Sequence, residues 1–327
     1  MPAALLRSAL LFLMLGLPAQ ASEQMTTAES AALLRKMGAA ARVLNYSGVY
    51  LFQRQDSMET FRLAHVFDAA GEQERRESLD GLPREFVRNN DQITCYMPNM
   101  KPFQLDRRAA NKFFPGIIPD QIVDVLSNYT FRKLNVERVA GYECQVVALD
   151  PRDKLRNPHR LCVEPNSGLM LKSAMYNPDR TVQLEQFTFT QLQIGGHIDK
   201  QALKPVLANK ALPVTPVPRQ VAPSPPQLGG DYVEFNSTNV PPGFRLVKET
   251  HTQLQGRAAP VLHYLYSDGM ATVSVFIEPA SNAQVDVPLA QGNVSFYTRQ
   301  VAGWRITAVG EVPLRTVQLF AQSYVPR

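Results

Sequence analysis

Three cysteines are the residues of this 327-residue chain with the most definite chemistry. Cys144 and Cys162 lie in two strand-like runs, YECQVVALD and HRLCVE, which are joined by a polar segment with two prolines. If these runs pair as an antiparallel hairpin, residues opposite each other have the Cβ spacing that a disulfide needs. We therefore predict a Cys144–Cys162 disulfide, worth about 3 kcal/mol by the loop-entropy estimate. Cys95 alternates with Ile93 and Met97 and is predicted to be a core residue.

The other residue types that catalyse reactions or bind metals are dispersed. The five histidines show no ligand spacing, and the sequence has no G-x-S-x-G, G-x-G-x-x-G, P-loop or H-E-x-x-H motif. A catalytic pair of carboxylates that are distant in the sequence but close in space stays an open alternative at this point. We therefore expect a binding protein rather than an enzyme, with no metal and no cofactor. A hydrolase whose site no motif reveals is the less favoured alternative.

Aromatic side chains and one apolar segment are the candidates for binding chemistry. Seven aromatic residues at strand spacing either enclose an apolar cavity or form a packed core: Tyr46, Tyr50, Phe52, Phe61, Phe67, Phe187 and Phe189. An acyl chain in such a cavity would gain about 0.8 kcal/mol for each buried methylene group. A segment punctuated by proline is predicted to form the mouth for a lipid, through Phe113, Phe114, Ile117 and Ile118.

The first 21 residues have the form of a secretory signal peptide. Arg7 precedes a short apolar run from Ala9 to Leu17, and Ala19-Gln20-Ala21 fits a cleavage site before Ser22. The run is too short to span a bilayer, so we expect an exported protein. The formal net charge of +5 becomes +4 when Arg7 is removed. This mild and dispersed charge does not favour nucleic acid as a partner.

The elements that would carry these residues are mostly strands. A capping box, Thr26-x-x-Glu29, begins an amphipathic helix, and many strand-like runs follow at short spacing as far as residue 194. Such a long antiparallel meander is expected to curl into a barrel or half-barrel. Residues 205–226 hold seven prolines and no acidic residue, which is typical of an extended linker.

The expected fold class is mainly β, with an α+β C-terminal part. The predicted parts are a signal peptide at 1–21, a curled antiparallel half-barrel with helices at 22–204, a proline-rich linker at 205–230, and a small α+β domain at 231–327.

Five stretches resemble the RseB/MucB family of periplasmic regulators of the envelope-stress sigma factor. They are N-Y-S-G-V-Y-L-F (Asn45 to Phe52), E-R-R-E-S-L-D-G (Glu74 to Gly81), V-P-P-G-F (Val240 to Phe244), Y-S-D-G-x-A-x-V-S-V-F-I-E (Tyr266 to Glu278) and V-G-E-V-P (Val309 to Pro313). Their order, together with the helix and the linker, carries the resemblance over nearly the whole mature chain.

The resemblance implies an N-terminal domain similar to the lipoprotein carriers LolA and LolB, which is an unclosed barrel with helices over its opening. The resemblance also implies a partner, which is the periplasmic segment of a membrane-spanning anti-sigma factor of the RseA/MucA kind. Binding would shield that segment from a site-1 protease of the DegS type, and lipopolysaccharide or another lipid would release it by favouring a different conformation or a homo-oligomer. The family has no catalytic residues to carry over.

Two further expectations accompany this resemblance. The turn Tyr266, Ser267, Asp268 and Gly269, with its neighbouring strands, is the predicted partner-binding face. A periplasmic carrier of lipids or lipoproteins is the alternative function, although such a carrier would not need a second domain.

Overall fold

A computed structural model of the chain describes residues 22–55, 57–105, 114–116, 121–210, 235–252, 261–280, 288–291 and 293–326. The predicted signal peptide, most of the predicted linker and three residues of the predicted lipid mouth (Phe113, Ile117 and Ile118) lie outside the described residues. None of the described helices combines the length and the apolar character needed to cross a membrane.

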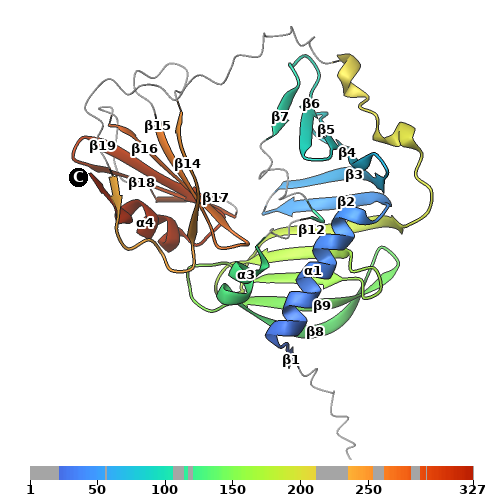
Figure 1. The fold of residues 1–327 in the computed structure, drawn as a ribbon, viewed down its shortest axis with the longest axis horizontal. Coiled ribbons are helices and arrows are strands. Elements are labelled where there is room, and N and C mark those ends of the chain that lie inside the picture. The colour runs from blue at the N-terminus through green and yellow to red at the C-terminus, as the bar shows by residue number, and fades with distance from the viewer. Residues whose placement is uncertain are drawn as a thin grey trace, which may run out of the picture.

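Twelve antiparallel strands form one large, strongly curled sheet in the N-terminal part of the chain (Figure 1). Their order is β1-β8-β9-β10-β11-β12-β2-β3-β4-β5-β6-β7, so the late strand β12 pairs with the early strand β2 at the middle of the sheet. Within the described residues β1 and β7 are the free edges, and the barrel is not closed. The strands are β1 (Glu23–Gln24), β2 (Tyr46–Arg54), β3 (Ser57–Asp68), β4 (Gly71–Ser78), β5 (Glu85–Asn89), β6 (Gln92–Tyr96), β7 (Phe103–Leu105), β8 (Tyr129–Val139), β9 (Tyr142–Pro151), β10 (His159–Val163), β11 (Met170–Tyr176) and β12 (Gln183–Ile194).

A β-bulge helps to bend this sheet between β2 and β12. The register shifts between Phe189 and Gln191, and Gly48 on the neighbouring strand lies opposite Leu192. A Cβ atom at Gly48 would lie 2.2 Å from the carbonyl oxygen of Gln191. Glycine is required there because the two backbones approach too closely for any side chain.

Two helices cover the concave side of the sheet. Helix α1 (Thr27–Val43) crosses in front of the strands, beside the short helix α3 (Ile122–Asn128) (Figure 1). The predicted capping box begins α1, because the Thr26 hydroxyl accepts from the Glu29 N–H while the Glu29 carboxylate accepts from the Thr26 N–H. The apolar stripe of α1, which includes Leu34 and Met37, is buried in the core of the domain.

The chain then crosses the convex face before it reaches the second domain. The 3₁₀ helices η1 (Lys200–Leu203) and η2 (Leu207–Lys210) follow β12. Leu203 packs on Ala64 and Val66, and the N–H of Leu207 donates to the Glu85 carboxylate at 2.8 Å. Packing therefore continues beyond residue 204, where the predicted N-terminal domain ends.

The C-terminal domain is a smaller sheet with its own core. Six antiparallel strands in the order β14-β15-β16-β19-β18-β17 carry helix α4 (Leu314–Ser323) on one face, and a two-stranded ribbon lies beside them. The predicted fold class, a curled antiparallel sheet with helices followed by a separate α+β domain, is confirmed. The strands are β13 (Phe235–Ser237), β14 (Arg245–Thr252), β15 (Val261–Ser267), β16 (Thr272–Pro279), β17 (Pro288–Gln291), β18 (Val294–Val301), β19 (Trp304–Gly310) and β20 (Tyr324–Pro326).

Candidate functional site

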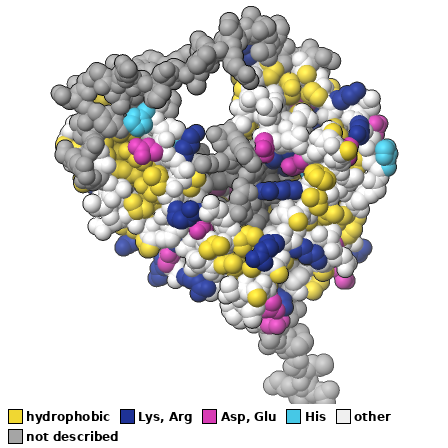
Figure 2. Space-filling model, in the orientation of Figure 1, with side chains coloured by type: hydrophobic (Ala, Val, Ile, Leu, Met, Phe, Trp, Pro, Cys, Tyr) yellow, Lys and Arg dark blue, Asp and Glu magenta, His cyan; other side chains and the backbone are white. Residues whose placement is uncertain are grey.

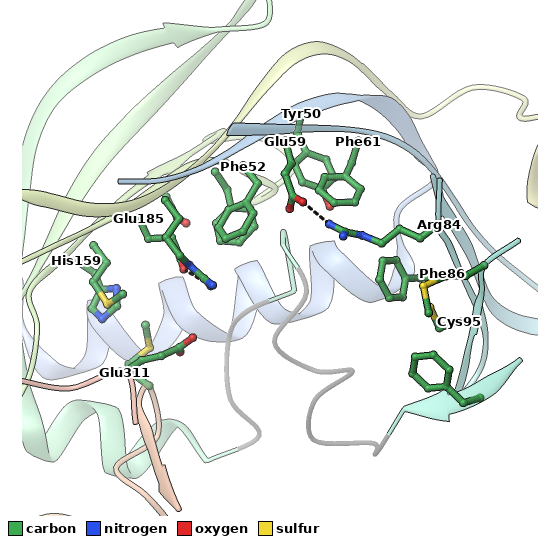
Figure 3. A pocket seen from close by; sticks show the side chains of 17 residues that line it. Tyr50, Phe52, Glu59, Phe61, Arg84, Phe86, Cys95, His159, Glu185 and Glu311 are labelled. Carbon is green, nitrogen blue, oxygen red and sulfur yellow. Dashed lines mark hydrogen bonds and ion pairs between the residues drawn. The ribbon is translucent and has the colours of Figure 1, made fainter. Parts of the chain in front are cut away.

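A cavity of about 440 Å³ lies on the concave side of the large sheet, where it meets the C-terminal domain (Figure 3). Strands of the N-terminal domain supply most of its lining, and Met270 and Glu311 of the C-terminal domain complete it. Since both domains contribute, the shape of this cavity depends on how the domains are placed. In Figure 2, charged side chains of both signs surround the middle of the molecule, where the two domains meet.

Aromatic rings form the apolar wall of the cavity. Alternate residues of a strand face the same side of a sheet, which is why Tyr50 and Phe52 on β2 both point inward (Figure 3). Phe52 stacks on Phe187 with ring centroids 4.4 Å apart, and Tyr50 stacks on Phe61 at 5.3 Å. The wall is continuous from β12 to β3, so it offers an elongated apolar surface.

Phe114 of the predicted lipid mouth is part of this aromatic cluster. Its side chain is fully buried and stacks on Phe187 at 5.3 Å, with Phe189 at 5.0 Å and Tyr50 at 5.4 Å. Phe114 therefore packs behind the lining rather than standing exposed at an entrance. The role of the segment as a mouth stays a prediction.

Ion pairs border the apolar wall. Arg84 donates to Glu59 at 2.6 Å (Figure 3). Arg54 donates to Glu185 at 3.2 Å. The two guanidinium groups also lie over aromatic rings of the cavity, that of Arg84 over Phe61 and that of Arg54 over Phe52. The site therefore combines an apolar wall with arginines whose charges are balanced by Glu59 and Glu185.

Two titratable groups of the lining are held in their neutral forms. Burial lowers the pKa of His159 to about 4, although the nearby Glu311 carboxylate opposes this shift. Burial also raises the pKa of the Cys95 thiol, which makes it a poor nucleophile at neutral pH. Among the described residues, no three side chains of His, Cys, Asp or Glu are grouped to hold a metal ion. The lining favours binding over acid–base or nucleophilic chemistry.

A fully buried ion pair joins the two domains next to the cavity. Nε of Arg156, in the loop between β9 and β10, donates to Oδ2 of Asp268 at 2.6 Å, and both side chains have no exposed surface. The Tyr129 hydroxyl donates to the same carboxylate oxygen at 3.2 Å. Arg156 also donates to the Pro242 carbonyl at 2.8 Å and stacks on the Phe244 ring at 4.5 Å. Burial raises the pKa of Asp268 in spite of its partner Arg156.

The predicted partner-binding turn lies at this contact. Tyr266 is buried in the C-terminal core, where its hydroxyl meets that of Tyr324 at 2.6 Å, and the Ser267 hydroxyl donates within the turn to the Ala271 carbonyl. Asp268 and Gly269 face the N-terminal domain. In this arrangement the turn is covered by the chain's own N-terminal domain, so its role in binding a partner stays a prediction.

The two cysteines of the predicted hairpin form a disulfide in the structure, with Cα atoms 5.3 Å apart. The geometry differs from the expected one. Cys162 pairs with Val146 in the register of β9 and β10, so Cys144 lies two residues along and the disulfide crosses the ladder diagonally. Both residues are buried, and Cys95 is a buried free thiol.

Four of the seven aromatic residues expected around a cavity line it, namely Tyr50, Phe52, Phe61 and Phe187. Tyr46 and Phe189 belong to the adjoining core. The expectation for Phe67 is wrong, because this side chain is 45% exposed near the β3–β4 turn, beyond the buried part of the strand.

The sequence patterns did not identify Met270 and Glu311 as lining residues of the cavity, or Arg156 as the partner of Asp268. Arg156 and Asp268 are 112 residues apart in the sequence, and no local pattern connects them.

Comparisons with known proteins match both domains. Residues 29–207 match the model of the MucB/RseB N-terminal domain, and residues 231–325 match that of the MucB/RseB C-terminal domain. The sigma factor AlgU regulatory protein MucB of Pseudomonas aeruginosa is 30% identical over 308 residues, which cover 91% of this chain and 92% of that protein.

Two further relatives agree with these matches. The sigma-E factor regulatory protein RseB of Haemophilus influenzae is 26% identical over 297 residues, covering 88% of this chain and 89% of that protein. A solved complex of Pseudomonas aeruginosa MucA and MucB contains a chain with a TM-score of 0.72 and 27% identity, which covers 91% of this chain and 99% of that chain. With both domain models matched in order across most of its length, the chain belongs to the MucB/RseB family.

Proposed function

We propose that this protein regulates a sigma factor by binding the periplasmic segment of a membrane-spanning anti-sigma factor related to MucA. Bound there, it shields the segment from site-1 proteolysis and so keeps the sigma factor inactive. The observation that carries the proposal is the likeness over both domains to MucB in its complex with MucA. Relatives that are named as sigma factor regulators support the same role.

The location and the mode of action follow from this role. A partner segment that is disordered alone would order on binding and lose its accessibility to a protease. The sequence signals favour export to the periplasm with cleavage before Ser22. Amino-terminal sequencing of the protein from a periplasmic extract should begin at Ser22, and a chain that retains residues 1–21 would contradict this location.

Lipid is the proposed signal for release. The cavity has an aromatic wall that suits an acyl chain such as those of lipopolysaccharide. An anionic headgroup would have to replace Glu59 or Glu185 as the partner of the arginines at the border. By linkage, a lipid that weakens binding of the partner must itself be bound more weakly when the partner is present. A homo-oligomer as the released form stays a prediction.

The binding proposal is tested with the purified mature protein and the labelled periplasmic segment of the MucA-related protein from the same organism. We expect saturable binding by fluorescence anisotropy, and loss of that binding when lipopolysaccharide is added. Absence of binding at saturating protein would reject the proposal. Binding of lipopolysaccharide without binding of the segment would instead favour the alternative, a lipid or lipoprotein carrier.

A further inference from the structure

The turn Ser267–Ala271 of the C-terminal domain contacts both the cavity and the domain interface. Its second residue, Asp268, uses both carboxylate oxygens. Oδ1 accepts from the backbone N–H groups of Met270 at 2.8 Å and Ala271 at 2.7 Å, and Oδ2 accepts from Arg156 and Tyr129 of the N-terminal domain. One carboxylate therefore ties the backbone of the turn to the other domain.

Met270 connects this carboxylate to the cavity. Its side chain lines the cavity and packs against the apolar core of the N-terminal domain, while its own N–H is held by Asp268. A ligand that displaced the Met270 side chain would shift the backbone that Asp268 binds. His159, three residues after Arg156, lines the cavity as well, so both partners of the ion pair have a near neighbour in the lining.

The surroundings of the turn leave no room for small adjustments. A Cβ atom at Gly269 would lie 2.8 Å from Cγ2 of Val125, and one at Gly243 would lie 2.1 Å from Oδ1 of Asn128. The Asn128 amide in turn donates to the carbonyls of Gly243 and Asp268, both at 3.1 Å. Because the backbone at both glycines already lies against side chains of the N-terminal domain, the interface either keeps this packing or separates. Packed interfaces switch between discrete arrangements rather than deforming gradually.

We propose that the Asp268 turn is a latch that couples occupancy of the cavity to the placement of the two domains. An empty cavity keeps Met270 inward and the Arg156–Asp268 pair closed, and a ligand that moves Met270 opens the pair and frees the domains. A separated pair regains solvation, whereas Asp268 would be strongly destabilised if it stayed buried without Arg156, its ion-pair partner among the described residues, so the latch has two well-defined states. The identity of the ligand rests on the proposed function, but the latch itself does not.

The latch is tested first without any ligand. Spin labels at Arg35→Cys on α1 and Gln322→Cys on α4, both exposed, report the distance between the domains. We expect one narrow distance distribution in the parent protein and a loss of that narrow distribution in Asp268→Asn and in Arg156→Gln. Arg245→Gln, which breaks the exposed interdomain pair of Arg245 with Asp124, is the matched control and should stay narrow.

A distribution that stays narrow in both latch variants would overturn the proposal. The near-isosteric Asp268→Asn change keeps the side-chain volume, and circular dichroism checks that each variant is folded. Should one latch variant fail to fold, the distance distribution of the other variant decides between the two outcomes.

Coupling to the cavity is tested with palmitate as the probe. We expect palmitate to broaden the distance distribution of the parent protein and to bind about tenfold more tightly to Asp268→Asn, which no longer has a closed latch to open. Met270→Ala should bind palmitate without the broadening.

Palmitate that binds the parent protein and leaves the interdomain distance unchanged would overturn the coupling. If palmitate does not bind at all, the lipid part of the proposed function fails, and the ligand-free comparison of the variants still decides on the latch.

Discussion

Among the described residues, two Asp–Arg ion pairs connect the domains, and they differ in their exposure to water. Arg156 and Asp268 have no exposed side-chain surface, whereas Asp124 is 16% and Arg245 is 48% exposed. Their geometry is similar, since the Nε–Oδ2 distances are 2.6 and 2.9 Å. The same pair of residue types is thus placed in two environments at one interface.

The difference shows what exposure decides. An exposed pair is screened by water and contributes about 0–1 kcal/mol, so its loss leaves both charges solvated. Removing one partner of a buried pair leaves the other charge without solvent or counterion, which costs about 3–5 kcal/mol. The buried pair therefore fixes the placement of the domains, while the exposed pair contributes little to it.

The largest effect is expected for Asp268→Ala. This change removes the carboxylate that holds the Met270 and Ala271 N–H groups of the turn. It also leaves Arg156 with Asp153 as its remaining ion-pair partner. We therefore expect the free energy of unfolding of the C-terminal domain to fall by about 3–5 kcal/mol. The single tryptophan, Trp304, lies in that domain, so its fluorescence during urea unfolding measures the change. A loss of only about 0–1 kcal/mol, as for an exposed pair, would contradict the claim that burial makes the Arg156–Asp268 pair the more important one.

Gly269→Ala tests the close approach beside the buried pair. Gly269 has a φ of +101° and no room for a Cβ, so we expect a loss of about 2–3 kcal/mol in the same urea measurement. Gly303→Ala is the matched control, because Gly303 has a φ of +80° with open space around its Cβ position. The control should lose only about 1 kcal/mol from backbone strain, and equal losses at both positions would contradict the tight contact at Gly269.

His159 makes the interface sensitive to acid. Its pKa is about 4 in the folded protein and about 6.5 in the unfolded chain, so the unfolded chain takes up the proton first. Stability is therefore lost as the pH falls from about 6.5 towards 4, by roughly 1–3 kcal/mol. Urea unfolding of the parent and of His159→Gln at several pH values in this range measures the effect. We expect the parent to lose more stability than the variant as the pH falls, and a stability difference that does not change with pH would contradict this.

The smallest effect is expected for Arg245→Gln. Breaking this exposed pair should change the free energy of unfolding by less than about 1 kcal/mol, and added salt should reduce even that change. Urea unfolding at low and high salt provides the measurement. A loss of several kcal/mol would mean that solvent exposure does not separate the two pairs.

The parts of the fold that local patterns encode were predictable. The capping box at Thr26 and Glu29 begins α1, and the alternation of Tyr50 and Phe52 places both rings on the concave side of the sheet. Such patterns follow from the periods of helices and strands, which a single sequence displays.

The parts that depend on long-range packing were not predictable. The meeting of Arg156 with Asp268 depends on the placement of two domains, and the diagonal disulfide depends on a register that alternation leaves undetermined. Phe67 continues the alternation of Phe61 along β3 yet is exposed, because the pattern reports a face of a strand and not how far the core extends along it.

The most direct test of the regulatory role is the rate at which a site-1 protease of the DegS type cleaves the periplasmic segment of the anti-sigma factor. We expect saturating amounts of this protein to slow the cleavage strongly, and lipopolysaccharide to restore it. An unchanged cleavage rate at saturating protein would contradict the proposed function.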